Sequence, residues 1–302
     1  MAALSSDISS AVLGAADAVT FGVMPLEAGA NRHAHVNLPW LAGLKEEQLF
    51  ANSALQVRVW RAAVAGPELE EVTRRIYDAL LADVGSANLV RVWNYVPQIN
   101  RVEEGLERYR AFSRGRAQAF EAAWGTHFEG RLPAAAGVGG SPDELVVIAA
   151  WGEGRAVAWE NPVQMPAYRY PAEYGPRSPS FARATHFLDG RDEWFFISGT
   201  AAVRGHASVA VGDLAGQIDC TMDNLRLIGA QGGIGAEVGA DGGWIRTFKV
   251  YLRNPADLAR AQSLLAGHAE FDATRALWVQ SDICRSDLLI EIEVTLRRAR
   301  RD

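Results

Sequence analysis

The 302-residue chain carries 30 basic and 36 acidic side chains, a net charge of −6, and 49% of its residues are apolar. This composition supports a packed core, disfavours a disordered chain, and argues against a nucleic-acid-binding protein, which needs a basic surface. The two cysteines, Cys220 and Cys284, are too few for a disulfide framework, and no spacing of Cys and His predicts a zinc site.

The beginning of the chain shows no targeting signal. Asp7 and Asp17 lie within the first twenty residues, where a secretory signal peptide would carry a basic start and an apolar run. No apolar run reaches the roughly 18 residues that a membrane span needs. We therefore expect a cytoplasmic protein with no membrane partner, and residues 1–30 are interpreted as an N-terminal extension.

The first half of the chain predicts alternating strands and helices. Apolar and β-branched runs predict strands over residues 54–63, 89–96 and 144–151. Apolar residues at helical spacing predict amphipathic helices over residues 69–81 and 109–124.

A long irregular segment, residues 159–183, follows with five prolines, three tyrosines and three arginines. Proline restricts the backbone, so such a segment can present side chains in one fixed geometry. Arg177 and Arg183 are suited to binding two carboxylates of one ligand. The alternative is a surface loop packed by its tyrosines, which are Tyr168, Tyr170 and Tyr174.

The second half predicts the order ββαβαββ. The predicted elements are a hairpin over 195–203 and 207–211, a helix over 214–228 capped by Asp213, a strand over 245–252, a helix over 255–265 with Asn254 as its cap, and strands over 276–283 and 288–296. Both halves contain αβαβ units of comparable size, which indicates a duplicated domain. We expect a first domain over residues 31–152 and a second over 153–302.

Glu291 and Glu293 alternate with apolar residues in the last predicted strand. Burial would raise the pKa of Glu291 and suit it to general acid or base catalysis. Under this hypothesis, one of the two glutamates faces solvent and the other is partly buried. The alternative is that both lie on an edge or a solvated face, and the pattern taken alone favours it, because charged side chains are rarely buried.

Two other positions leave alternatives open. Gly199, in a predicted strand, marks either a close approach by a ligand or by backbone, or a bulge, and Cys284 is either a reactive thiol or an inert core residue. The glycine-rich stretch over 229–243 fails the G-x-G-x-x-G spacing and is expected to be a loop. The chain lacks the G-x-S-x-G, H-E-x-x-H and P-loop motifs.

The second half resembles the RidA (YjgF) domain, in which the first Glu of a closing I-E-I-E strand faces a ligand cleft. Ala276 stands where that domain has a carboxylate-binding Arg, which argues against RidA imine hydrolysis. Longer motifs are similar to those of the chorismatases. These are V-W-N-Y-V-P at 92–97, E-R-Y-R-A-F-S-R-G-R at 107–116, E-N-P at 160–162, A-Y-x-Y-P-x-E-Y-G-P-R-x-P-S-F-A-R-A at 167–184, F-I-S-G-T-A at 196–201 and D-I-C-R-x-D-L-L at 282–289.

The resemblance implies an α/β (α+β) fold of two tandem RidA/YjgF-like, chorismate-mutase-like domains, each a mixed sheet covered by two helices. It also implies an enzyme that removes pyruvate from chorismate without cofactor or metal. Glu291 would protonate the enol-ether methylene, and Arg177 and Arg183 would bind the two carboxylates. The other implied substrate contacts are Tyr95, Tyr168, Tyr174 and Thr200.

Gly199 and Cys284 match the chorismatases that aromatise their substrate, which implies 3-hydroxybenzoate and pyruvate as products. The alternatives are 4-hydroxybenzoate, hydrolysis to trans-3,4-dihydroxycyclohexa-1,5-diene carboxylate, a RidA-like imine deaminase, and a non-catalytic sensor of small ligands. The expected assembly is a monomer or a small homo-oligomer, and the expected role is supply of an aromatic starter unit in bacterial secondary metabolism.

Overall fold

The computed structural model describes residues 53–64 and 66–300, together with four short strands nearer the N-terminus. These strands are β1 (Ser9–Val12), β2 (Thr20–Phe21), β3 (Met24–Pro25) and β4 (Val36–Asn37). Most of the predicted N-terminal extension and the start of the first predicted domain lie outside the described residues. Within the described part of the chain, no helix is long and apolar enough to cross a membrane.

The first half forms a five-stranded sheet in the order β1-β5-β10-β6-β9, with β6 and β9 parallel. Its elements are β5 (Gln56–Ala63), α2 (Leu69–Val84), β6 (Asn88–Val96), β7 (Val102–Glu103), β8 (Leu106–Glu107), α3 (Arg108–Trp124), η1 (Phe128–Arg131), β9 (Ala134–Gly139) and β10 (Glu144–Gly152). The apolar face of α2, including Ile76 and Leu80, packs with Phe112 of α3 against the sheet around Trp60.

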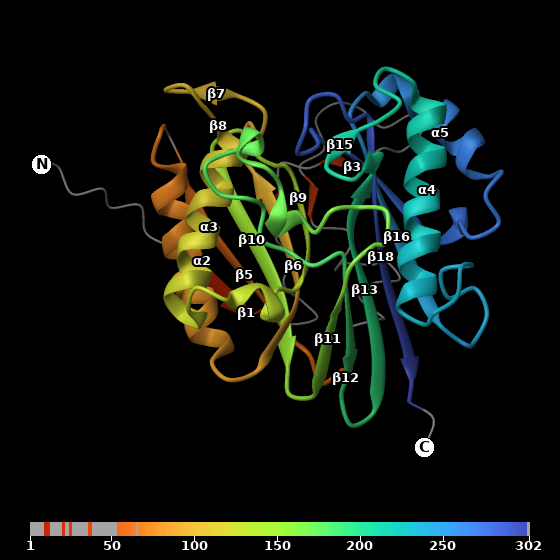
Figure 1. The fold of residues 1–302 in the computed structure, drawn as a ribbon, viewed down its shortest axis with the longest axis horizontal. Helices are drawn as coiled ribbons and strands as arrows, with labels where there is room; N and C mark the ends of the chain where they lie inside the picture. Colours follow the sequence, from red (N-terminus) through yellow and green to blue (C-terminus); the bar gives the residue numbers. More distant parts are fainter. Residues whose placement is uncertain are drawn as a thin grey trace, which may run out of the picture.

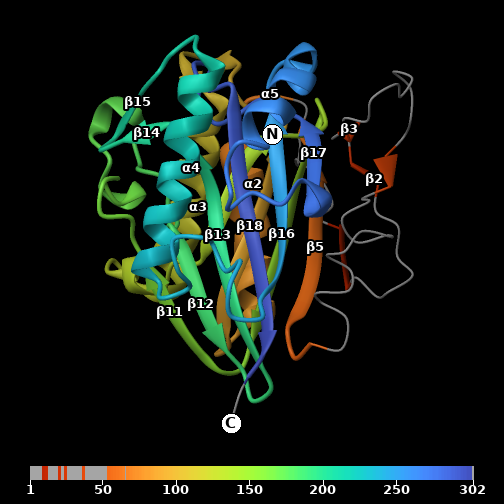
Figure 2. The ribbon, with the colours of Figure 1, turned by 90° about the vertical axis from the view of Figure 1, so that its right-hand side faces the viewer.

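The second half forms a seven-stranded sheet in the order β11-β12-β13-β18-β16-β17-β3. Its elements are β11 (Arg155–Trp159), η2 (Ala167–Arg169), η3 (Ala172–Tyr174), β12 (Ala184–Leu188), β13 (Asp192–Ala201), β14 (Val203–Arg204), β15 (Ala207–Ser208), α4 (Leu214–Gln231), β16 (Ile245–Leu252), η4 (Pro255–Asp257), α5 (Leu258–Leu265), η5 (Ala273–Arg275), β17 (Ala276–Gln280) and β18 (Ile290–Ala299). Figure 2 shows α4 and α5 over the outer face of this sheet.

The two sheets repeat one topology. The order β5-β10-β6-β9 matches β13-β18-β16-β17, and β16 runs parallel to β17 as β6 does to β9. The sheets lie face to face, with α2 and α3 outside one and α4 and α5 outside the other (Figure 1). The space between them holds large buried rings, among them Trp93, Trp194 and Tyr251. The predicted duplicated α/β fold is therefore confirmed.

The predicted hairpin over 195–203 and 207–211 forms only at its end, where Val203 of β14 pairs with Ser208 of β15. Most of the first range belongs to β13, which pairs instead with β12 through a tight turn in which the Asp189 carboxylate accepts the backbone N–H groups of Arg191 and Asp192. The Asp189–Gly190 dipeptide was the overlooked hairpin signal. Strand β9 was not predicted, because its sequence AAAGVG is poor in β-branched residues and its parallel pairing with β6 is a tertiary effect.

The two predicted helix caps differ. The Asp213 side chain accepts the N–H of Ala215, as predicted. Asn254 makes no side-chain cap hydrogen bond; its amide donates instead to the Asp257 carboxylate, and the helix begins as the short 3₁₀ turn η4.

Candidate active site

A cavity of about 330 Å³ lies where the two halves of the chain meet. The first half contributes the start of α3, including Tyr109 and Arg110. The second half contributes residues of the irregular segment, the end of β13, the connection before β18, and Glu291. The volume falls within the range typical of small-molecule sites.

Glu291 and Glu293 are both buried, with only 3% and 2% of their surfaces exposed. Residues two apart on a strand share a face, and here that face points across to the first sheet. The prediction of a solvated face, for either or both of them, is therefore wrong. The reason is tertiary, since β18 lies between β13 and β16 in its own sheet and is covered by the other sheet.

Glu293 is fully compensated by cations and a donor from both sheets. It accepts from Arg91 at 2.5 Å, from Lys249 at 2.6 Å and from the Trp93 indole at 2.8 Å. Burial alone would raise the pKa of Glu293, but Lys249 and Arg91 outweigh burial and hold that pKa below its ordinary value. Glu293 is therefore an ionised, structural carboxylate.

Glu291 lacks such compensation. Its Oε1 atom is buried and has no hydrogen-bond partner among the residues that the structure describes. Burial, and next the charge of Glu293, raise the pKa of Glu291 from 4.5 to about 8. At neutral pH the carboxyl is mostly protonated and faces the cavity, which suits it to donate a proton.

Gly199 gives the Glu291 carboxyl its space. A Cβ atom at position 199 would lie 2.0 Å from Oε1 of Glu291 and 3.3 Å from Cβ of Ala136. The register between β13 and β18 also shifts between Ile197 and Thr200, so Gly199 lies at a strand irregularity. The interpretation as a bulge is therefore confirmed, and the close approach at this glycine is by the Glu291 side chain.

Cys284 also lines the cavity, and its side chain is half-buried. Burial, and next the charge of Glu291, raise the pKa of this thiol to about 12. A neutral thiol is a poor nucleophile, so the geometry does not support a reactive thiolate. Cys284 instead contributes a small apolar surface beside Glu291.

Two cavity arginines carry positive charge without an ion pair to any described residue. Arg183 donates to the carbonyl of Met165 at 2.9 Å and to the Tyr170 hydroxyl at 2.8 Å, and its buried Nε has no partner in the described structure. Arg285 lies over the Tyr174 ring at 4.4 Å and donates to backbone and hydroxyl oxygens. The sequence analysis overlooked Arg285, although it lies in the quoted D-I-C-R motif.

Four predicted substrate contacts lie outside the cavity. Arg177 pairs with Glu121 at 2.8 Å near the surface. Thr200 lies outside the cavity because its side chain points to the opposite face of β13 from its two neighbours, which line the cavity. Its hydroxyl donates to the carbonyl of Ser198. Tyr95 is buried in the core between the sheets, and Tyr168 packs on the first helical layer beside a separate groove.

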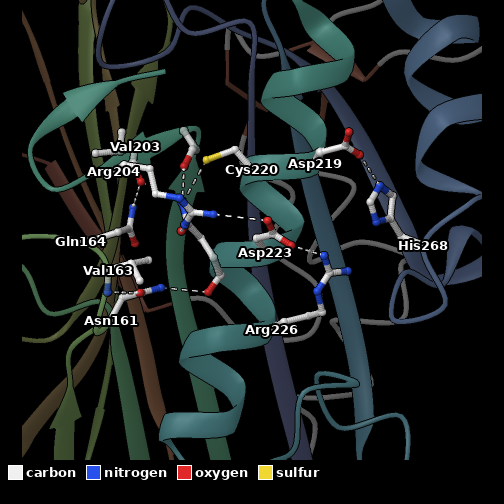
Figure 3. A network of polar contacts seen from close by, with 12 residues as sticks. Asn161, Val163, Gln164, Val203, Arg204, Asp219, Cys220, Asp223, Arg226 and His268 are labelled. Carbon is white, nitrogen blue, oxygen red and sulfur yellow. Dashed lines mark hydrogen bonds and ion pairs between the residues drawn. The ribbon is translucent and has the colours of Figure 1, made fainter. Parts of the chain in front are cut away.

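A buried polar network fixes the cavity wall to α4, as Figure 3 shows. The Asn224 side-chain amide donates to the backbone carbonyls of Ala201 and Val203 at 3.0 and 3.1 Å, and the backbone carbonyl of Asn224 accepts from the Asn161 side chain. Gln164, which lines the cavity, donates to the carbonyl of Val203 at 3.2 Å. The irregular segment is therefore tied to the helix and strand that frame Glu291.

The first sheet has no carboxyl at the position that corresponds to Glu291. In the matched strands β16 and β6, Tyr251 pairs with Glu291 and Tyr95 pairs with Val146. Val146 is fully buried and apolar. Among the described residues, the acidic position of β18 therefore has no carboxyl counterpart in β10.

The raised pKa of Glu291 makes a prediction for stability. A carboxyl whose pKa is higher when folded loses stability as pH rises from the unfolded pKa of 4.5 to the folded pKa of about 8. The free energy of unfolding of Glu291→Gln should therefore rise relative to wild type over that window, by up to about 1.4 kcal/mol per pH unit. Urea unfolding at several pH values measures this difference, with the exposed Glu153→Gln as control. Parallel curves for wild type and Glu291→Gln would reject the assignment.

Comparison with known proteins agrees with this geometry. Residues 43–150 match the model of the chorismatase FkbO/Hyg5-like N-terminal domain. The chain is 39% identical over 235 residues to a 3-hydroxybenzoate synthase of Streptomyces hygroscopicus, covering 74% of this chain and 68% of that protein. It is 40% identical over 223 residues to a chorismatase of the same organism, covering 71% of this chain and 63%, less than two thirds, of that relative. A chorismatase crystal structure superposes with a TM-score of 0.70 at 30% identity, over 81% of this chain and 78% of that one. The chain belongs to the chorismatase family.

Proposed function

We propose that this protein cleaves chorismate to 3-hydroxybenzoate and pyruvate. The observation that carries the proposal is the Glu291 carboxyl, which is buried, unpaired and protonated at neutral pH in a cavity that also holds Arg183 and Arg285. The identity to a protein named 3-hydroxybenzoate synthase supports the choice of product.

The cavity charges suit a dianion of this size. Chorismate carries one carboxylate on its ring and one on its enolpyruvyl ether, and the guanidinium groups of Arg183 and Arg285 hydrogen-bond to described oxygens without an ion pair to a described carboxylate. Arginine binds a carboxylate through two parallel donors and stays charged. Arg183 and Arg285 therefore replace the pair Arg177 and Arg183 that the sequence predicted. Both halves of one chain line the cavity, so we propose that the site is complete in a single subunit. We also propose that the enzyme is cytoplasmic.

The reaction begins with proton transfer from Glu291 to the methylene carbon of the enolpyruvyl group, which leaves an oxocarbenium-like centre. The bond between the ring carbon and the ether oxygen then breaks, and its electrons form the keto group of pyruvate. The oxygen of the neighbouring ring hydroxyl takes the vacated position and passes its proton to the ionised Glu291. The bond from that oxygen to its original carbon breaks, the newly substituted carbon loses its hydrogen as a proton, and the oxygen regains a proton. The products together have the composition of chorismate, so no water is consumed.

Gly199 and Cys284, which line the cavity together with the Glu291 carboxyl, both influence the choice of product. Gly199 leaves room for Glu291, because a Cβ atom at this position would lie 2.0 Å from the Oε1 atom of that carboxyl. The Cys284 sulfur fills space beside the carboxyl that a water molecule would otherwise occupy. Keeping water away favours displacement by the ring hydroxyl over hydrolysis to trans-3,4-dihydroxycyclohexa-1,5-diene carboxylate, which is called the dihydrodiol below.

The activity is tested by incubating the pure protein with chorismate and separating the products by chromatography. We expect equal amounts of pyruvate and 3-hydroxybenzoate, and Glu291→Gln should lower kcat/KM by at least ~100-fold, because the amide cannot donate a proton to carbon. Glu153→Gln, on an exposed turn, should behave as wild type. Absence of pyruvate above background refutes the function, dihydrodiol as the main product refutes the product assignment, and near-normal turnover of Glu291→Gln refutes the mechanism.

Removal of the Cys284 sulfur tests the control of product. Cys284→Ala opens space beside Glu291 without adding charge, so the dihydrodiol fraction should increase several-fold while pyruvate release continues. Cys220→Ala serves as the matched control, because Cys220 is a buried residue of α4 and does not line the cavity. The product ratio is read by chromatography, and an unchanged ratio in Cys284→Ala contradicts the role given to the thiol.

A further inference from the structure

Three tyrosines line the cavity, and two of their hydroxyl groups are already engaged by the protein. The Tyr170 hydroxyl accepts from Arg183 at 2.8 Å, and the Tyr174 hydroxyl lies 3.1 Å from Nδ1 of His206. The Tyr109 hydroxyl forms no hydrogen bond with any residue that the structure describes. It is therefore the cavity phenol that is available to a bound ligand.

The fold holds the Tyr109 ring in one position. Tyr109 is the second residue of α3, and its ring stacks on the fully buried Phe112, with centroids 6.2 Å apart and planes inclined by 19°. The ring also lies against Gly137 of β9, where a Cβ atom would be 3.2 Å from Cε2 and 3.8 Å from the hydroxyl oxygen. A side chain so confined presents its hydroxyl with little loss of entropy on binding.

Strand β9 also links Tyr109 to the acid. Ala136 precedes Gly137 and lies 3.3 Å from the Cβ position of Gly199, which in turn lies 2.0 Å from Oε1 of Glu291. Burial, and next the charges of Cys284 and Glu291, raise the pKa of Tyr109 above its ordinary value, although Arg116 opposes them. The phenol is therefore neutral and can accept a hydrogen bond as well as donate one.

We propose that the Tyr109 hydroxyl donates a hydrogen bond to the ring hydroxyl of bound chorismate and thereby selects the aromatic product. This inference rests on the proposed function. Displacement by the ring hydroxyl requires one lone pair to point at the neighbouring ring carbon while its proton remains free to pass to Glu291, and a fixed donor to the other lone pair sets that orientation. Tyr109 makes and breaks no covalent bond. Without it, the hydroxyl rotates freely and water competes for the same carbon.

The test is Tyr109→Phe, which keeps the ring contacts with Phe112 and Gly137 and removes only the hydroxyl. We expect kcat to fall by roughly 10-fold, the amount expected for one neutral hydrogen bond. The dihydrodiol fraction should rise, while the melting temperature and the Kd for chorismate measured with Glu291→Gln as background change little. A purely structural role would change the melting temperature and leave the product ratio unaltered.

Tyr77→Phe is the matched control. Tyr77 is a fully buried residue of α2, donates to Asn94 at 2.6 Å and lies outside the cavity. Its loss should lower the melting temperature and leave the product ratio unchanged. Wild-type kcat and product ratio in Tyr109→Phe would overturn the inference while the proposed function stands. Failure of the wild type to release pyruvate would instead refute the proposed function, and this inference with it.

Discussion

The site depends on the burial of two carboxyl groups on one face of one strand. The negative charge of Glu293 is balanced, since Arg91, Lys249 and the Trp93 indole all donate hydrogen bonds to its carboxylate. The buried Oε1 of Glu291, two residues earlier, has no such donor among the described residues, and burial and the charge of Glu293 outweigh the more distant Arg91 and Arg183, so the neutral acid is favoured. The Glu291 carboxyl therefore stays protonated at neutral pH in an apolar interior. Burying this group lowers the stability of the fold, and the apolar core packed between the two sheets offsets that loss.

The duplicated fold explains why one chain suffices for the site. The second half supplies the acid and the arginines, while the first half supplies Tyr109 and the strand β9 that lies against Gly199. The matched position in the first sheet is Val146, an apolar residue that contributes to the core instead of chemistry. One half thus serves mainly as the wall of the other half's cavity.

Much of the fold follows from local patterns, whereas much of the site does not. The periodic apolar residues of α2 and α4 and the runs of β16 and β18 were sufficient to predict those elements. The sequence pattern around Glu291 predicted a solvent-exposed side chain, because the sequence of a single strand contains no information about the sheet that covers it. Arg177 was chosen for its residue type, yet Glu121 on α3, 56 positions away, neutralises it. Arg285 and Tyr109 lay within recognised motifs, but only the tertiary structure shows that both reach the cavity.

The central claim, that Glu291 is held as a neutral acid, is tested most directly by titrating its side-chain carboxyl carbon by isotope-edited NMR. Assignment comes from the signal lost in Glu291→Gln. The account predicts a titration midpoint near pH 8 for Glu291. A midpoint near 4.5, the ordinary value for glutamic acid, would contradict it.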